Sequence, residues 1–243
     1  MSTVEQTKAL GREGNQDVLG TAGLGVLFSV AVLNEFVTTD PGVPLARPQA
    51  GDIIAAALIG LIVAGVGWFI NSRGGWLRVR SRKSHARHIP FAIAAGVAMG
   101  VVILAQVVVL AQVDSGVRQS YLRFISEPLL HPLHRTFSAA VIEEVLFRYI
   151  GMTAIALVVV RRLAKPQLAY RVALISSAAI FGALHLPALS FAGLVIVLFN
   201  MIAGLLYGWM FWHWGLIHPM LAHFVAGSVR GIIIQSFGAT LFA

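Results

Sequence analysis

Apolar residues form long blocks along this chain, and short polar segments separate them. A block of about 20 apolar residues is long enough to cross a membrane as a helix. The pattern predicts seven apolar spans, at residues 20–37, 51–71, 90–113, 137–160, 172–187, 190–212 and 214–228. A short apolar tail at 231–243 is predicted to be a half-span or an interfacial helix. We therefore expect an all-α polytopic membrane helix bundle with about 7–8 transmembrane helices.

The segment 114–136 fits neither a span nor a short loop, because apolar and polar side chains are mixed there and two prolines interrupt it. An interfacial or re-entrant helix is the expected structure. The chain then divides into a polar amino-terminal tail, amino-terminal transmembrane helices, this segment, a carboxy-terminal transmembrane domain and the apolar tail, at 1–19, 20–113, 114–136, 137–230 and 231–243. No internal repeat is visible, which disfavours a transporter built from inverted repeats.

The composition supports a membrane protein. Hydrophobic residues make up 58% of the chain and charged residues 12%, against about 25% charged residues in soluble domains. The absence of cysteine excludes a thiol nucleophile, a thiolate metal site and a disulfide framework. The polar first 20 residues do not resemble a cleavable signal peptide. We expect an integral multi-pass protein of a prokaryotic cell membrane.

The net charge of +8 reflects basic residues that collect in the loops between spans, so no nucleic-acid partner is expected. Twelve Lys and Arg residues lie in the amino-terminal tail and in the loops 72–89 and 161–171. Five lie on the opposite side, namely Arg47, Arg118, Arg123, Arg135 and Arg230. Because cytoplasmic loops carry the excess of positive charge, the amino terminus is predicted to face the cytoplasm.

Three charged residues interrupt the apolar span 137–160: Glu143, Glu144 and Arg148. Each would cost roughly 2.5–3.5 kcal/mol near the middle of a membrane helix, and such residues usually mark a functional site. Glu144 and Arg148 are four residues apart and can pair directly, whereas Glu143 points about 100° away from Glu144. One glutamate can thus be paired while the other faces a cavity. Adjacent carboxylates also raise each other's proton affinity, which suits a general base or acid.

Three of the eight histidines lie within apolar spans: His185, His218 and His223. Phe181 and His185 are four residues apart and share one helix face. If the spans alternate in direction, His185 and His223 reach a depth similar to that of Glu143, in the outer half of the membrane. We therefore expect these three residues to converge. His218 precedes a proline and is interpreted as a polar group at a helix break.

These ordered motifs resemble those of the CAAX-protease and bacteriocin-processing (CPBP) intramembrane protease family, to which the Ras-converting enzyme belongs. The motifs are Glu143-Glu144-x-x-x-Arg148, Phe181-x-x-x-His185 and a later span containing His223. The resemblance covers about residues 137–230. It implies an endopeptidase acting on a membrane-embedded or lipidated peptide or protein within the lipid bilayer.

The resemblance also implies a role for each motif residue. Glu143, with His185, would activate a water molecule, and His223 would stabilise the oxyanion. Glu144 and Arg148 would orient the site. No cofactor or metal would be required. Gly204 and Gly208 resemble the family's small-residue span and would allow close helix approach.

One position departs from the family pattern. The residue four positions after the last motif histidine is commonly Asn in the family, as a second oxyanion donor, and here it is Gly227. Loss of such a donor typically lowers the rate about 10²–10³-fold. Asn200 and Ser228 are the nearest polar candidates to replace it.

Three alternatives stay open at this stage. Glu143, His185 and His223 could bind Zn²⁺ as a catalytic metal, although the H-E-x-x-H signature is absent. A catalytically weak or inactive CPBP-fold protein could act in bacteriocin-type immunity or as a scaffold, which Gly227 favours. A proton-coupled transporter is disfavoured because other spans lack deeply placed acidic groups. The predicted topology, with the site nearer the outer face, also disfavours prenylated cytosolic proteins as substrates.

Overall fold

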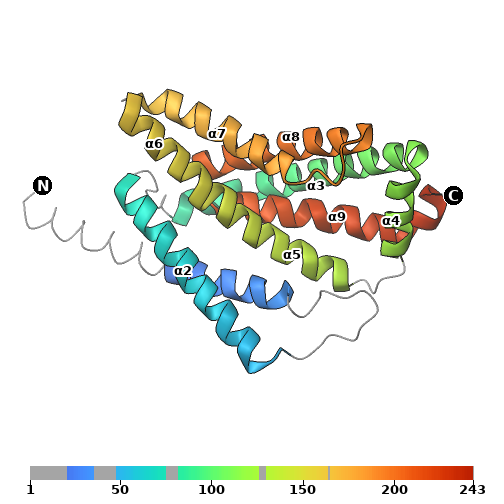
Figure 1. Ribbon diagram of the computed structural model, residues 1–243, viewed down its shortest axis with the longest axis horizontal. Helices are drawn as coiled ribbons and strands as arrows, with labels where there is room; N and C mark the ends of the chain where they lie inside the picture. The colour runs from blue at the N-terminus through green and yellow to red at the C-terminus, as the bar shows by residue number, and fades with distance from the viewer. Residues whose placement is uncertain (1–20, 36–47, 75–81, 126–129, 164, 243) are drawn as a thin grey trace, which may run out of the picture.

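The computed structural model describes residues 21–35, 48–74, 82–125, 130–163 and 165–242, and these residues contain helices but no strand (Figure 1). The predicted tail at 1–19 lies outside these ranges. The expectation of an all-α fold is confirmed. In chain order the described helices are Thr21–Glu35, α2 (Ala50–Gly74), α3 (Arg82–Val113), α4 (Ser115–Ile125), α5 (Leu130–Glu144), η1 (Val145–Met152), α6 (Thr153–Leu163), α7 (Pro166–Ala183), α8 (Phe191–Trp214) and α9 (Ile217–Leu241).

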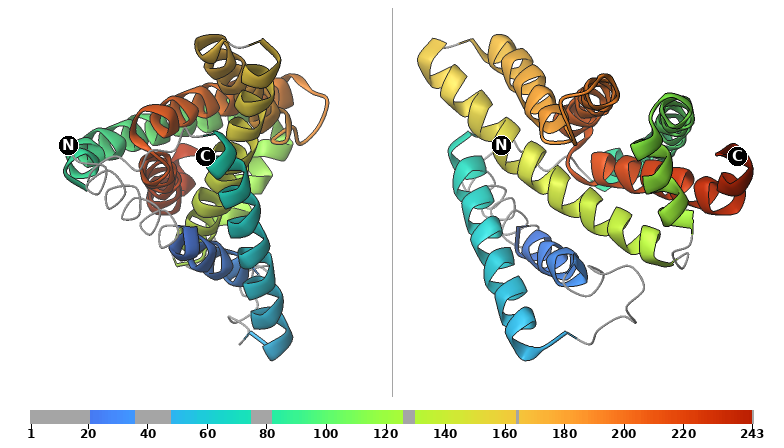
Figure 2. Two further views of the ribbon diagram at one scale, coloured as in Figure 1. Left: turned by 90° about the vertical axis from the view of Figure 1, so that its left-hand side faces the viewer. Right: turned by 45° about the vertical axis from the view of Figure 1, so that its right-hand side comes forward.

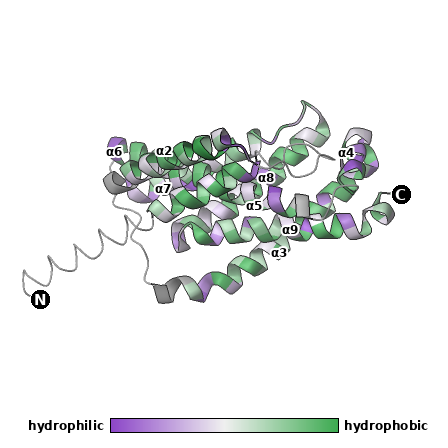
Figure 3. Ribbon diagram, turned by 90° about the horizontal axis from the view of Figure 1, so that it is seen from below, coloured by the Kyte–Doolittle hydropathy of each residue, from purple (hydrophilic) through white to green (hydrophobic). Residues whose placement is uncertain are grey.

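Four of these helices contain segments long and apolar enough to cross a membrane: Ala50–Ile70, Ala86–Val113, Phe191–Trp214 and Ile217–Leu241. Apolar residues dominate the long helices, whereas hydrophilic residues are prominent in α4 (Figure 3). Large apolar side chains such as Ile54 and Leu61 in α2 are more than half exposed, as expected for side chains that face lipid. The chain is therefore a membrane helix bundle.

Three predicted boundaries need correction. The span 214–228 and the tail 231–243 form one helix, α9, which runs through Arg230 without a break. No proline or capping residue interrupts the apolar sequence there, and Ile234 is fully buried in contact with the rest of the bundle. The span 172–187 ends early, because α7 stops at Ala183 and His185 lies in the turn that follows. Pro187 explains this end, since proline disfavours helical conformation in the residue before it.

The segment 114–136 contains the short helix α4 and the first two turns of α5, while residues 126–129 are not described. Asp114 precedes α4, and its Oδ1 accepts a hydrogen bond of 3.0 Å from the Val117 backbone N–H, a helix N-cap contact. None of the residues of α4 is fully buried. The structure thus has a short helix, α4, in this segment, while its interfacial or re-entrant position stays a prediction.

A π-helix was not predicted. Helix α5, the π-helix η1 and α6 follow one another without a gap, so that the span predicted at 137–160 lies in a longer helical rod (Figure 2). π-Helical turns are rare, and they occur frequently at functional sites. This one begins directly after Glu144 and includes Arg148.

Two helix contacts that position α9 and α7 depend on glycine. In α3, a Cβ atom at Gly96 would lie 2.6 Å from the Ala222 carbonyl oxygen of α9, and one at Gly100 would lie 2.7 Å from that of Ala226. In α8, a Cβ atom at Gly204 would lie 3.0 Å from the Ala178 Cα of α7. The close approach expected at Gly204 is thus confirmed, and it brings α8 against α7, the helix that precedes His185.

Candidate active site

Glu144 and Arg148 form a fully buried ion pair. Arg148 Nε lies 3.0 Å from Glu144 Oε2, and both side chains are 0% exposed. The same guanidinium donates a hydrogen bond of 3.2 Å to Ser177 Oγ in α7. Its central carbon also lies 4.8 Å from the ring centroid of Phe181, within the range of a cation–π contact. The predicted pairing of Glu144 with Arg148 is confirmed.

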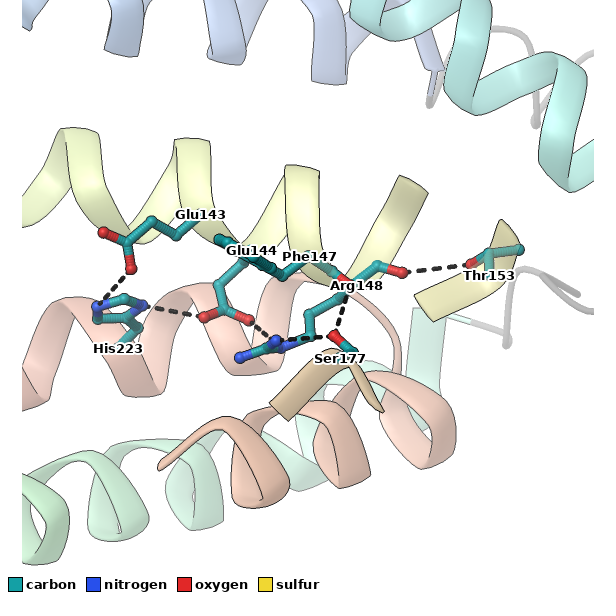
Figure 4. A network of polar contacts seen from close by, with 7 residues as sticks. All are labelled: Glu143, Glu144, Phe147, Arg148, Thr153, Ser177 and His223. Atoms are coloured by element: carbon teal, nitrogen blue, oxygen red, sulfur yellow. Dashed lines mark hydrogen bonds and ion pairs between the residues drawn. The ribbon is translucent and has the colours of Figure 1, made fainter. Parts of the chain in front are cut away.

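The wide turns of η1 are supported by two side-chain hydroxyls (Figure 4). Thr153 Oγ1 donates to the Arg148 carbonyl oxygen at 3.3 Å, and Ser177 Oγ donates to the Phe147 carbonyl oxygen at 2.9 Å. Ser177 therefore accepts from Arg148 and donates to the backbone of the same segment. This arrangement joins the ion pair, the π-helix and α7 into one polar network.

Glu143 lies at the open edge of this network, with 25% of its side chain exposed. One carboxylate oxygen, Oε1, is 3.9 Å from His185 Nε2, and the other, Oε2, is 3.8 Å from His223 Nε2. Both distances exceed those of a direct hydrogen bond. The three residues thus converge, as the sequence predicted, without direct hydrogen bonds between Glu143 and either histidine.

The other ring nitrogens show how the two histidines are oriented. His185 Nδ1 lies 2.8 Å from the Phe181 carbonyl oxygen, which can only accept, so this nitrogen carries a proton. In the neutral ring, Nε2 then faces Glu143 as an acceptor. His223 Nδ1 lies 3.0 Å from Glu144 Oε1 and donates to that carboxylate. Glu144 therefore links Arg148 to His223, a connection that sequence reasoning did not predict (Figure 4).

Two buried aromatic residues form the wall behind the histidines. The Tyr207 ring stacks on His223 with centroids 5.1 Å apart, and Phe181 lies 4.7 Å from the His185 ring and 6.2 Å from that of His223. Sequence reasoning missed Tyr207 and Ser177 as site residues. Their spacing could have indicated them. Ser177, Phe181 and His185 follow one another at intervals of four residues, as residues on one helix face do, and Tyr207 lies between Gly204 and Gly208.

A side chain of α5 fills the space in which a side chain at position 227 would lie. A Cβ atom at Gly227 would collide with the Thr136 side chain, including Oγ1 at 2.9 Å. Of the two polar candidates, Asn200 donates its amide to the Ile196 carbonyl oxygen of its own helix at 2.9 Å. Ser228 Oγ is buried and has no hydrogen-bond partner among the described residues. Neither contacts Glu143, His185 or His223 through a hydrogen bond within the described part of the chain.

The donor set was also expected to be able to hold zinc. Among the described residues, no group of three or more His, Asp or Glu side chains is arranged to bind a metal ion.

Fold and site together define an all-helical membrane protein with a carboxylate–histidine site inside the bundle. Residues 125–229 match the family described as type II CAAX prenyl endopeptidase Rce1-like. This segment of the chain is thus Rce1-like, and the resemblance inferred from the motifs is confirmed. Neither the curated proteins nor the solved structures give a significant match. The description of this family is that of an endopeptidase, which is a hydrolase of peptide bonds.

Proposed function

We propose that the protein is a glutamate-type intramembrane endopeptidase in which Glu143 is the general base. The observation that carries this proposal is the placement of the two Glu143 carboxylate oxygens opposite His185 Nε2 and His223 Nε2, at 3.9 and 3.8 Å. Glu143 Oε2 is buried and has no hydrogen-bond partner among the described residues. A buried acceptor of this kind calls for a partner, and a water molecule between Oε2 and His223 Nε2 supplies one. The similar spacing of Oε1 and His185 Nε2 suits a second water, which is the one that attacks the substrate.

The bridging water would be held by two acceptors. It donates one hydrogen to Glu143 Oε1 and the other to His185 Nε2, because the His185 proton resides on Nδ1. Its oxygen lone pairs then face the open side of the site. This orientation prepares the water for attack, since the base lies within reach of the proton that it must accept.

The reaction would proceed by two proton transfers. Glu143 takes a proton from the water while the water oxygen bonds to the peptide carbonyl carbon, which gives a tetrahedral oxyanion. The doubly protonated His223 ring donates from Nε2 to that oxygen, while its Nδ1 proton stays with Glu144. The carbon–nitrogen bond then breaks, and Glu143 returns its proton to the leaving amine.

The surroundings of His185 favour a membrane-associated substrate. The turn that carries His185 and the start of α8 expose Leu184, Leu189 and Phe191, whose exposed fractions are 70%, 90% and 74%. Apolar residues exposed beside a site inside a membrane protein suit a peptide that lies in the bilayer or is attached to it by a lipid. A membrane-embedded or lipidated peptide is therefore the substrate class that we propose.

Glu143→Gln tests the base directly. It keeps the shape of the side chain and removes its basicity, and we expect cleavage of a membrane-associated peptide to fall by at least about 10²–10⁴-fold. Glu35→Gln is the matched control, because Glu35 is also a glutamate within a predicted apolar span. A Glu143→Gln variant that is folded and cleaves at the wild-type rate would overturn the proposal.

Metal dependence is tested separately. Elemental analysis measures the zinc content of the purified protein before and after chelation, and the cleavage assay measures its activity. We expect the activity to be independent of the zinc content. Stoichiometric zinc that is lost together with activity would instead support a metal site formed by Glu143, His185 and His223.

A second candidate function is favoured by Gly227. Thr136 fills the space at the position of the family's asparagine, so the site lacks that donor. A catalytically weak or inactive protein that keeps the fold, for immunity or as a scaffold, would tolerate this change. A biological phenotype that survives alanine at both Glu143 and His185 would support this candidate over the peptidase.

A further inference from the structure

Tyr207 is a buried aromatic residue of α8 to which the proposed reaction assigns no role. Its side chain is 1% exposed and belongs to an apolar cluster that includes Ala203 of the same helix and Ala222 and Ala226 of α9. Close packing of this kind holds a side chain in one place, because the short alanine side chains around the ring cannot move aside. Tyr207 therefore forms a rigid surface beside the segment of α9 that carries His223.

Three contacts hold the His223 ring. The Tyr207 ring lies nearly parallel to it, with an interplanar angle of 18° and centroids 5.1 Å apart, whereas Phe181 meets it edge-on at 88° and 6.2 Å. The third contact is the 3.0 Å hydrogen bond from Nδ1 to Glu144 (Figure 4). Nearly parallel rings at this centroid distance form an offset stack, which is one of the arrangements that aromatic pairs prefer. One face of the imidazole is thus covered, while Nε2 faces Glu143 at 3.8 Å.

The hydrogen bond to Glu144 does not by itself fix the position of His223 Nε2. A hydrogen bond keeps most of its strength while its angle bends by about 30°. Because Nε2 lies across the five-membered ring from Nδ1, a tilt of that size moves Nε2 by about 1 Å while the contact with Glu144 persists. A displacement of about 1 Å can lower the rate about 10²-fold. The flat face of Tyr207 opposes this tilt on the side where the two rings are in contact.

The same contact suits a positively charged His223 ring. In the proposed reaction this ring is doubly protonated when it donates to the oxyanion, and the Glu144 carboxylate that it contacts is already paired with Arg148 at 3.0 Å. The face of an aromatic ring is negatively polarised and attracts a cation within about 6 Å of its centroid. The Tyr207 face therefore stabilises the charge that the oxyanion contact requires, without a further buried carboxylate.

Resting on the proposed peptidase function, we propose that Tyr207 is a positioning residue of the reaction, whose ring face holds the His223 imidazole so that Nε2 is directed at the substrate oxygen. The role belongs to the ring rather than to the hydroxyl, because the ring is the part that stacks on His223. A phenylalanine should therefore be able to replace Tyr207, whereas an aliphatic residue should not.

Cleavage of a membrane-anchored fluorogenic peptide tests the role of the ring. Tyr207→Phe keeps the aromatic face and should retain a kcat close to that of wild type. Tyr207→Leu removes the face and should lower kcat by about 10- to 100-fold, because Nε2 of His223 is no longer held in place. KM should change little in both variants, since the lost interaction acts in the transition state. Tyr170→Leu is the matched control and should keep the wild-type kcat, because Tyr170 packs on the Trp212 ring at 4.7 Å, outside the site.

Thermal unfolding distinguishes a misplaced histidine from a damaged fold. The kinetics of each variant are measured below its own unfolding midpoint, and Tyr207→Met, whose flexible side chain fills the space, repeats the test if Tyr207→Leu does not fold. Equal losses of kcat in Tyr207→Phe and Tyr207→Leu would overturn the assignment to the ring. A folded Tyr207→Leu variant with the wild-type kcat would overturn it as well. So would a rise in KM at unchanged kcat, which would mean a role in substrate binding.

The NMR signal of His223 separates this inference from the proposed chemistry. Ring signals are recorded in detergent on protein with isotope-labelled histidine, and the signal that is missing in His223→Gln is assigned to His223. An aromatic face shifts the signals of a ring stacked on it upfield. This shift should persist in Tyr207→Phe and disappear in Tyr207→Leu, even if Glu143→Gln shows that Glu143 is not the base. An unchanged His223 signal in Tyr207→Leu would overturn the positioning role, whatever the cleavage results are.

Discussion

The neighbouring glutamates of α5 lie in opposite surroundings. Glu144 is 0% exposed and contacts Arg148 and His223 at 3.0 Å each. Glu143 is 25% exposed, and both of its histidine neighbours lie nearly 4 Å away. The rotation of about 100° between successive helix residues is enough to produce this difference. The comparison teaches that the charged motif has two halves. Glu144 and Arg148 form the closed half, in which buried charges are paired and stabilise the fold. Glu143 forms the open half with its histidine neighbours, and it is available for a ligand.

Substitutions in the closed half should have the largest effect on the stability of the fold. Arg148→Met leaves the Glu144 carboxylate buried without its cation, and we expect a loss of about 3–5 kcal/mol in the free energy of unfolding. Thermal unfolding in detergent measures it. The double variant Glu144→Gln and Arg148→Met removes both charges and should recover a large part of the loss. Equal stability of the single variant and wild type would show that the pair does not stabilise the fold.

Substitutions in the open half should lower the rate of cleavage. His185→Ala removes the second acceptor for the water and should lower kcat by about 10²–10⁴-fold. Its midpoint of thermal unfolding should stay close to that of wild type, because the His185 side chain is 33% exposed and lies in the turn after α7 rather than in the core. If His185→Ala unfolded at as low a temperature as Arg148→Met, the proposed difference between the two halves would be wrong.

Ser177 probes the link between the ion pair and the π-helix. Ser177→Ala removes the acceptor of the Arg148 hydrogen bond and the donor to the Phe147 carbonyl oxygen. We expect a loss of about 1.5–3 kcal/mol in unfolding free energy, since one of these bonds involves a charged group. Ser177→Thr, which keeps the hydroxyl, is the comparison. Hydrogen exchange of the η1 amides should increase in the alanine variant and much less in the threonine variant.

The smallest expected effect concerns Gly227. Gly227→Ala pushes a methyl group against Thr136 and should cost about 1–3 kcal/mol through overpacking. Adding Thr136→Ala makes room and should restore part of the loss. Urea or thermal unfolding of the two single variants and the double variant forms a double-mutant cycle. Additive losses would mean that the two side chains do not share this space.

Several features of the fold and site could be predicted from the sequence. The charged motif in an apolar span indicated the pair Glu144–Arg148, because residues four apart meet on any regular helix. The convergence of Glu143, His185 and His223 followed from the alternation of spans. Gly204 and Gly208 indicated the close contact of α7 and α8. These successes depend on local spacing and on the constraint that a membrane places on helix direction.

Other features depend on contacts that no local pattern reveals. The π-helix requires Thr153 and Ser177 to supply hydrogen bonds to backbone carbonyls, and Ser177 comes from another helix. The contact of Thr136 with Gly227 joins residues that are distant along the chain. The continuity of α9 is set by packing rather than by hydropathy, whereas the end of α7 at Ala183 follows from Pro187, a local signal that hydropathy alone does not register. The sequence prediction placed Arg230 in a loop because hydropathy did not indicate that α9 continues past it.

The π-helix has a consequence for how this protein can change through insertions and deletions. Each wide turn holds about one residue more than an α-helical turn, so η1 fixes the angular phase between the residues before it and those after it. Before it, Glu143 and Glu144 face α9, and within it Tyr149 packs against Gly67 of α2. Deletion of a single residue from Val145–Met152 would turn one of these faces away from its neighbour by about a quarter turn. The length of this segment is therefore fixed by its contacts with both α2 and α9.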